Sequence, residues 1–298
     1  MVSTDAPDDE LPARATTVGR MAVRRLLPQR TRRTVGPWCF ADILGPGDVT
    51  PERGLDIGPH PHTGLHTVTW LVEGVVRHRD SLGVDQTIAP GQLNLMTAGR
   101  GVAHAEEAAP PYAGPLLGIQ LWIAQPDATR HDAPAFEHHG DLPRLDVPGG
   151  EAIVVLGELE GVVSPARRDS PLIAVELTLS EDVTIPLEPS FEHALVVLHG
   201  AVRRADRPLG EGHGAYLASG RDELALEVEE PTRALLIGGE PLGEDLVLWW
   251  NFVGRDAGEV DRWVEEWNSG DGPAFGAVTS GLARVPAPLR QRRVDNSR

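Results

Sequence analysis

Short apolar runs alternate with Gly, Pro, Asp and Asn from Val35 to Asp245, with breaks every 8–12 residues. The runs that we expect to form strands are His66–Val76, Gln92–Met96, Leu116–Ile123, Ala152–Leu156, Ile173–Leu179, Ala194–Val202 and Ala234–Ile237. Helical spacing is clear only over Asp256–Asn268, where apolar residues recur at i, i+3, i+4 and i+7. The pattern predicts an all-β protein, built as sandwiches or barrels, with one C-terminal helix.

A weak internal repeat indicates two lobes. Val72–Val76 resembles the segment 126 residues later, and Met96–Arg100 resembles the segment 121 residues later. The two offsets differ by no more than a loop length, so we expect two β lobes of similar topology, joined near residues 141–150. The expected layout is one barrel at residues 21–140, a second at 150–255, a helix and return segment at 256–285, and flexible tails at 1–20 and 286–298.

Composition narrows the class of protein. The 298 residues are 41% hydrophobic, which suffices for two cores, and the net charge is −17. All 27 basic residues are arginine, so Schiff-base chemistry and a P-loop are excluded. The negative charge argues against direct nucleic-acid binding. Five arginines between Arg24 and Arg33 predict a solvated or ion-paired first strand.

The cysteine content and the lengths of the apolar runs indicate the cellular compartment. The single cysteine, Cys39, cannot form an intrachain disulfide and is expected to be a buried core thiol. No apolar run reaches the roughly 18 residues of a membrane span, and a signal-peptide core is missing from residues 1–20. We therefore expect a soluble, cytoplasmic protein without a membrane partner, and a monomer by default.

Histidines carry the candidate chemistry. His60 and His62 share one face of an extended chain at a spacing of about 6.6 Å, which allows both imidazoles to converge on one ion. His104 and Glu106 form a second i, i+2 pair. Scattered surface histidines are the alternative, but two such pairs in a strand-rich chain favour a shell of three histidines and one carboxylate. These donors suit Fe, Mn, Ni, Cu or Zn.

The order of motifs resembles the pirin family of bicupins. The similarity is dense over residues 35–125 and thinner but collinear afterwards, and it rests on these segments: Val35–Trp38, Pro59–Gly64, Thr67–Leu71, Glu73–Gly74, His78–Gly83, Pro90–Gly91, Met96–Gly101 and His104–Glu106. The resemblance implies two cupin barrels face to face, with one mononuclear metal ion, expected to be Fe(II), in the N-terminal barrel. The implied ligands are His60, His62, His104 and Glu106.

The resemblance also implies a second barrel without metal. By the two offsets, Pro186 and Glu188 replace the first histidine pair, Ala225 replaces His104, and only Glu227 is shared. The remaining histidines of this half are therefore expected at the surface or in hairpins; they are His193, His199 and His213.

Several residues near the motif have less direct roles. Many pirins have a glutamate where this chain has His66, which has the strand parity of His62 and lies about 13 Å along the strand. We expect His66 in the pocket wall or behind the ligands, with direct coordination as the alternative. His78 is expected to stabilise a hairpin. Tryptophans near the C-terminus are expected to pack the lobes together rather than bind a cofactor: Trp249, Trp250 and Trp263.

Three functions compete for this site. The resemblance implies flavonol (quercetin) 2,3-dioxygenase activity, with Glu106 as both metal ligand and proton acceptor from a flavonol hydroxyl. The second hypothesis is a non-enzymatic, metal-dependent redox switch that binds a protein partner, either a transcription regulator or a metabolic enzyme. A purely structural metal site is disfavoured because such sites are usually closed. The sequence favours the dioxygenase but does not decide between enzyme and switch.

Overall fold

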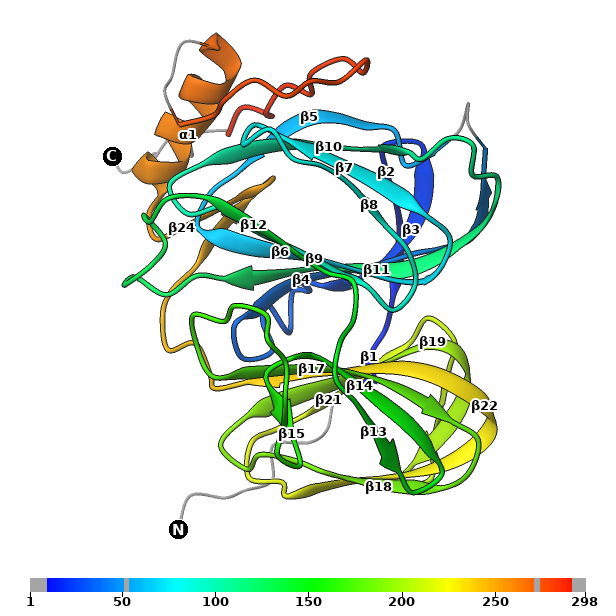
Figure 1. Ribbon diagram of the computed structural model, residues 1–298. Coiled ribbons are helices and arrows are strands. Elements are labelled where there is room, and N and C mark those ends of the chain that lie inside the picture. Colours follow the sequence, from blue (N-terminus) through cyan, green and yellow to red (C-terminus); the bar gives the residue numbers. More distant parts are fainter. Residues whose placement is uncertain (1–9, 51–53, 271–273, 291–298) are drawn as a thin grey trace.

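A computed structural model describes residues 10–50, 54–270 and 274–290, and these form two stacked β lobes (Figure 1). The N-terminal lobe contains a seven-stranded antiparallel sheet in the order β12 (Ala135–His139), β9 (Leu93–Thr97), β6 (Leu65–Glu73), β11 (Gly114–Ala124), β4 (Trp38–Val49), β3 (Met21–Leu27) and β2 (Arg14–Val18). A four-stranded sheet faces it, in the order β5 (Ile57–His62), β10 (Val102–Ala108), β7 (Val76–Asp80) and β8 (Asp85–Ile88).

The C-terminal lobe is one large sheet that folds on itself. Its main path is β1 (Glu10–Leu11), β21 (Gly214–Leu217), β19 (Glu192–Arg204), β22 (Glu223–Gly239), β17 (Leu172–Leu179), β14 (Gly150–Leu156) and β13 (Arg144–Val147). Two further strands pair with members of this path: β18 (Val183–Pro186) with β22, and β20 (Arg207–Gly210) with β19. A small hairpin, β15 (Glu158–Leu159) and β16 (Val162–Val163), completes the lobe.

Strand register confirms the internal repeat. In the first lobe Thr67 of β6 pairs with Met96 of β9. The sequence offsets of 126 and 121 residues place His193 and Leu217 at the equivalent positions, and these two residues pair between β19 and β21. The similar sequence segments are therefore equivalent strands of two lobes with related topology.

The largest apolar cluster joins the lobes. Trp38 and Trp70 of the first lobe pack in it with Val196 and Leu235 of the second, and both tryptophans are fully buried. A separate aliphatic cluster fills the interior of the C-terminal lobe. The first lobe therefore meets the second through the outer face of its seven-stranded sheet, and two further apolar clusters pack within the first lobe itself.

The C-terminal segment returns to the first lobe. Strands β23 (Val247–Trp249) and β24 (Phe252–Gly254) precede helix α1 (Ala257–Ser269), whose N-cap is Asp256, as the apolar spacing predicts. Phe252, Val260 and Trp267 pack in one cluster with Ala103 of β10. The apolar side chains of β23, β24 and α1 in this cluster are therefore packed against the first lobe. No helix in the described ranges is long and apolar enough to span a membrane.

Both expected tails differ from the structure where it describes them. Leu11 in β1 is buried in the interlobe cluster, and β1 pairs with β21 of the second lobe. Residues 14–18 form β2, which pairs with β3. At the other end, the indole N–H of Trp249 donates to the carbonyl of Pro288. Residues 1–9 and 291–298 lie outside the described residues. Strand pairing, burial of Leu11 and the hydrogen bond to Pro288 therefore position segments that composition alone marked as tails.

Candidate metal centre

Three histidines meet inside the N-terminal lobe. His60 lies opposite His104 in the β5–β10 pair, and His62 follows His60 on the same face of β5. One ligand nitrogen from each of these three residues lies within 4.8 Å of the other two, and all three side chains are buried. The structure thus brings together the histidines of both predicted pairs because the sheet places β10 beside β5.

Hydrogen bonding leaves the Nε2 atom of His60 free. Its Nδ1–H donates to the carbonyl of Gly58 at 2.9 Å. The Nε2 atoms of His62 and His104 lie 3.0 Å apart, which is a separation that two nitrogen ligands of one ion, with bonds of about 2.1 Å, can also have. Burial lowers the pKa of His60 to about 4 and holds the pKa values of His62 and His104 well below normal. Neutral imidazoles with convergent nitrogens fit a metal ion.

His78 orients His104 through a contact with its Nδ1 atom. The Nε2–H of His78 donates to the Asp80 carboxylate at 3.2 Å, so a neutral His78 has an acceptor at Nδ1. That atom lies 3.2 Å from Nδ1 of His104, whose N–H must then donate, which leaves Nε2 of His104 as a free lone pair. The expected hairpin role belongs to Asp80, which accepts from the backbone N–H groups of Leu82 and Val84. The i, i+2 spacing of His78 and Asp80 in the sequence is the signal that could have identified His78 as a residue that Asp80 orients.

Glu106 lies in the same cavity but outside the group of three histidines. The β5–β10 register shifts between His104, opposite His60, and Glu106, opposite Ile57, so the strand is irregular between the two side chains. The side chain is buried, and this burial raises the pKa of Glu106 to about 7. The roles of Glu106 as ligand and proton acceptor stay predictions.

A cavity of about 500 Å³ opens beside the histidines. One wall is aromatic: Phe40 and Trp122 stack with ring centroids 3.9 Å apart. The polar side chains that line the cavity include Gln120, Glu106 and the Arg25–Asp42 pair. The volume lies within the range of pockets for small organic ligands, and the mixture of an apolar wall with a few polar groups is typical of them.

The C-terminal segment closes one side of this cavity. Trp250 and Val285 line it, and the N–H of Val285 donates to the carbonyl of Pro59 at 2.9 Å. Thr63 forms a β-bridge with Phe252. Trp249, Trp250 and Trp263 are packing residues, but they do not join the two lobes as expected: their apolar cluster holds the C-terminal segment on the first lobe. Trp250 in addition contributes to the cavity.

His66 lies at the lobe interface and does not line the cavity, which corrects the expected pocket-wall position. The parity argument fails because Gly64, with φ of +68°, forms a turn between β5 and β6, and these strands belong to different sheets. Along β6, His66 therefore shares its face with Val68 and Trp70, which pack between the lobes. His66 is also outside the group of three histidines.

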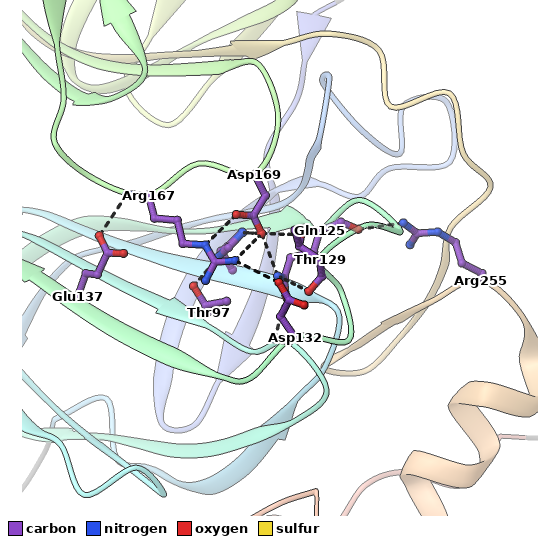
Figure 2. Close-up of polar contacts among 10 residues, drawn as sticks. Thr97, Gln125, Thr129, Asp132, Glu137, Arg167, Asp169 and Arg255 are labelled. Atoms are coloured by element: carbon purple, nitrogen blue, oxygen red, sulfur yellow. Dashed lines mark hydrogen bonds and ion pairs between the residues drawn. The ribbon is translucent and has the colours of Figure 1, made fainter.

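Asp169 from the second lobe organises the contacts around His66. The Nε2–H of His66 donates to the Asp169 carboxylate at 3.1 Å. Gln125, Thr129 and Arg167 donate to the same carboxylate, and the dashed lines of Figure 2 show how these side chains surround it. Burial acts to raise the pKa of Asp169, but the hydrogen bonds outweigh it and hold that pKa well below its usual value. These contacts connect the lobes through polar groups.

The second lobe offers no comparable site within the described ranges. Its equivalent strands carry Pro186 and Ala225, and its interior is filled by aliphatic side chains. His199 and His213 are exposed as expected. His193, however, is buried, which corrects the surface assignment: it occupies the position of Thr67 on an inner strand. Cys39 is a buried thiol as predicted, and burial raises its pKa to about 12.

The arginines expected in a solvated or ion-paired first strand are divided by the structure: Arg24 and Arg25 lie in β3, the third strand of the chain, and are ion-paired, whereas Arg30 and Arg33 follow this strand and are exposed. Arg25 donates through Nε and Nη2 to the two oxygens of Asp42, at 2.8 and 2.7 Å. Arg24 pairs with Glu211 of the second lobe. The arginines of this strand thus pair with carboxylates of both lobes, Asp42 in the first and Glu211 in the second.

Comparison with known proteins extends the resemblance over both lobes. Residues 20–123 match the family model described as Pirin, and residues 172–273 match the model described as Pirin C-terminal cupin domain. A Pseudomonas aeruginosa protein named "Putative quercetin 2,3-dioxygenase" is 45% identical over 262 residues, which cover 87% of this chain and 83% of that protein. A Caulobacter vibrioides "Pirin-like protein" is 35% identical over 266 residues, covering 87% of this chain and 92% of that protein.

A solved structure agrees with the fold. The crystal structure of quercetin 2,3-dioxygenase from Acinetobacter baumannii superposes with a TM-score of 0.92 at 40% sequence identity. The match covers 96% of both chains. The two-cupin architecture is therefore shared over nearly the whole length.

Proposed function

The chain belongs to the pirin family, and we propose that it is a mononuclear iron protein that cleaves flavonols in the manner of a quercetin 2,3-dioxygenase. The observation that carries the proposal is the position of three buried, convergent imidazoles at the wall of a cavity of about 500 Å³ with an aromatic face. The names of the Pseudomonas and Acinetobacter proteins support the same activity.

The proposed ion is held by His60, His62 and His104, with Glu106 as a fourth ligand. When bound, Fe(II) would supply open coordination positions and Lewis acidity toward a substrate hydroxyl, and Mn, Ni, Cu or Zn could occupy the same donors. The protein provides neutral imidazoles because burial disfavours their charged forms. His78 and Asp80 orient His104, as outer partners of metal ligands commonly do.

The substrate would be positioned by the cavity wall. The stacked rings of Phe40 and Trp122 offer a flat apolar surface for a fused aromatic ring. Glu106 would accept the proton of the flavonol hydroxyl, since it is buried in the same cavity and hydrogen-bonds to no other described side chain. Enclosure by Trp250 and Val285 would limit water at the reacting atoms.

The decisive experiment is anaerobic loading of the purified protein with iron, followed by addition of quercetin and O₂. We expect O₂ uptake with stoichiometric release of carbon monoxide. If the loaded protein binds quercetin but consumes no O₂, the oxygenase proposal is wrong, and the metal-dependent redox switch with a protein partner becomes the better account of the site.

A further inference from the structure

Three arginines near the N-terminus form no ion pair with the residues that the structure describes, although Arg14 interacts electrostatically with the nearby Asp42. Arg24, Arg25 and Arg32 pair with Glu211, Asp42 and Glu192, respectively. Arg14, Arg30 and Arg33, by contrast, are exposed and form no ion pair with any residue that the structure describes. The chain has 44 acidic residues and only 27 basic ones, so carboxylates are abundant. A concentration of unpaired positive charge is therefore unusual on this molecule.

These arginines line a surface pocket of about 680 Å³. No carboxylate among the described residues contributes to its lining. The pocket adjoins the histidine cavity, because both are lined by Arg25, Pro28 and Leu248. Positive charge and concave shape together create a place where an anion is attracted and partly desolvated.

Arg25 links the two spaces. Its Nε and Nη2 atoms are engaged by Asp42, which fixes the plane of the guanidinium group. The guanidinium carbon lies 4.6 Å from the ring centroid of Phe40, and Phe40 stacks on Trp122 of the histidine cavity. The aromatic wall thus continues directly into the arginine-lined pocket.

We propose that the pocket formed by Arg14, Arg25, Arg30 and Arg33 is a subsite for an anionic substituent of an aromatic substrate. The aromatic ring would lie against Phe40 and Trp122, and a carboxylate or sulfo group would reach the arginines. This inference rests on the proposed function, which it deepens: the preferred substrate class is an aromatic oxyanion rather than a neutral flavonol. Arginine suits such groups because its N–H donors match the oxygens of planar or tetrahedral oxyanions.

The test is anaerobic binding of two matched ligands, quercetin and quercetin-5′-sulfonate, to the metal-loaded protein, followed by tryptophan fluorescence, since Trp122 and Trp250 line the cavity. We expect the sulfonate to bind roughly tenfold more tightly. The double variant Arg30→Gln/Arg33→Gln should lose most of that preference and leave quercetin binding unchanged. Added salt should reduce the preference of the natural protein, because exposed charges are screened.

Arg262→Gln is the matched control: it removes an exposed arginine on α1 that lines neither space. The subsite would be refuted if the protein bound the two ligands with equal affinity, or if it bound neither of them. It would also be refuted if Arg262→Gln lost as much of the preference for the sulfonate as the double variant does. Arginine-dependent sulfonate binding without O₂ consumption on either ligand would support the subsite and refute the oxygenase proposal, so the two failures are distinguishable.

Discussion

The Nδ1 atom of His78 lies 3.2 Å from the Nδ1 atom of His104, and Asp80 fixes the direction of the hydrogen bond between them. Because the Asp80 carboxylate accepts from Nε2–H of His78, the remaining lone pair of His78 accepts from His104. The free Nε2 of His104 then points to the other two histidines. A residue on β7 thus sets the tautomer of a candidate ligand on β10.

His78→Ala should weaken metal binding about 10- to 100-fold without unfolding the protein, because the tautomer and orientation of His104 are no longer fixed. His78→Gln should recover part of the loss, since its amide oxygen can accept from His104. Competition with a chelator measures both affinities. Unchanged affinity in His78→Ala would show that the contact with His104 has no role in binding.

His60→Ala and His104→Ala should each lose most of the metal that the purified natural protein carries, which we expect to be close to one ion per chain. Elemental analysis of the purified variants measures the content. His199→Ala, at an exposed position, and His66→Ala, at the lobe interface, should keep theirs. Full occupancy in both His60→Ala and His104→Ala would contradict the ligand assignment.

Glu106→Gln should lower quercetin turnover by about 100-fold or more while anaerobic quercetin binding changes little, because the proton acceptor is lost. The comparison of O₂ uptake with fluorescence titration separates the two effects. Glu107→Gln serves as the control, since this neighbouring carboxylate pairs with Arg79 and does not line the cavity. Parallel loss of binding and turnover would limit Glu106 to the role of a ligand.

Asp169→Asn should reduce the free energy of unfolding by about 2 kcal/mol at pH 7, because the buried donors His66 and Gln125 and the partly buried Thr129 lose their charged acceptor. The pKa of Asp169 is depressed in the folded state, so its contribution is present above the unfolded value of about 3.9 and lost as pH falls below it. Denaturant titration at pH 7 and pH 3 should therefore show a smaller difference between the two proteins at pH 3. An equal difference at both pH values would argue against the charge as its cause.

His193 should make the fold sensitive to mild acid. Burial lowers its pKa to about 4, below the unfolded value of about 6.5. The unfolded state binds more protons between these values, so the free energy of unfolding falls on acidification through this range, by at most about 3 kcal/mol from this group.

His193→Gln should flatten the profile of unfolding free energy between pH 6.5 and 4. His199→Gln, which removes a mostly exposed histidine, should leave the profile as it is. Denaturant titrations across this range measure the slopes. The same slope in His193→Gln and the natural protein would mean that other groups cause the acid sensitivity.

Local sequence patterns were sufficient to predict much of the fold and part of the candidate site of this protein. Short apolar runs broken by regular turn residues predicted the strands, the 3.6-residue period predicted α1 and its N-terminal boundary, and the i, i+2 spacing predicted that His60 and His62 share a face. Two sequence echoes predicted lobes whose strand registers correspond. These features depend on neighbours within one strand or helix, so the sequence alone contains them.

Tertiary structure decided what lies across strands and between lobes. The turn at Gly64 moves His66 from the expected cavity wall to the lobe interface, and strand pairing brings His78 behind His104. Folding also gathers Arg14 and Arg33 around a pocket beside the histidines. Sequence spacing specifies which face of one strand a residue occupies, but the neighbours of that face depend on sheet order and on long-range burial of apolar side chains.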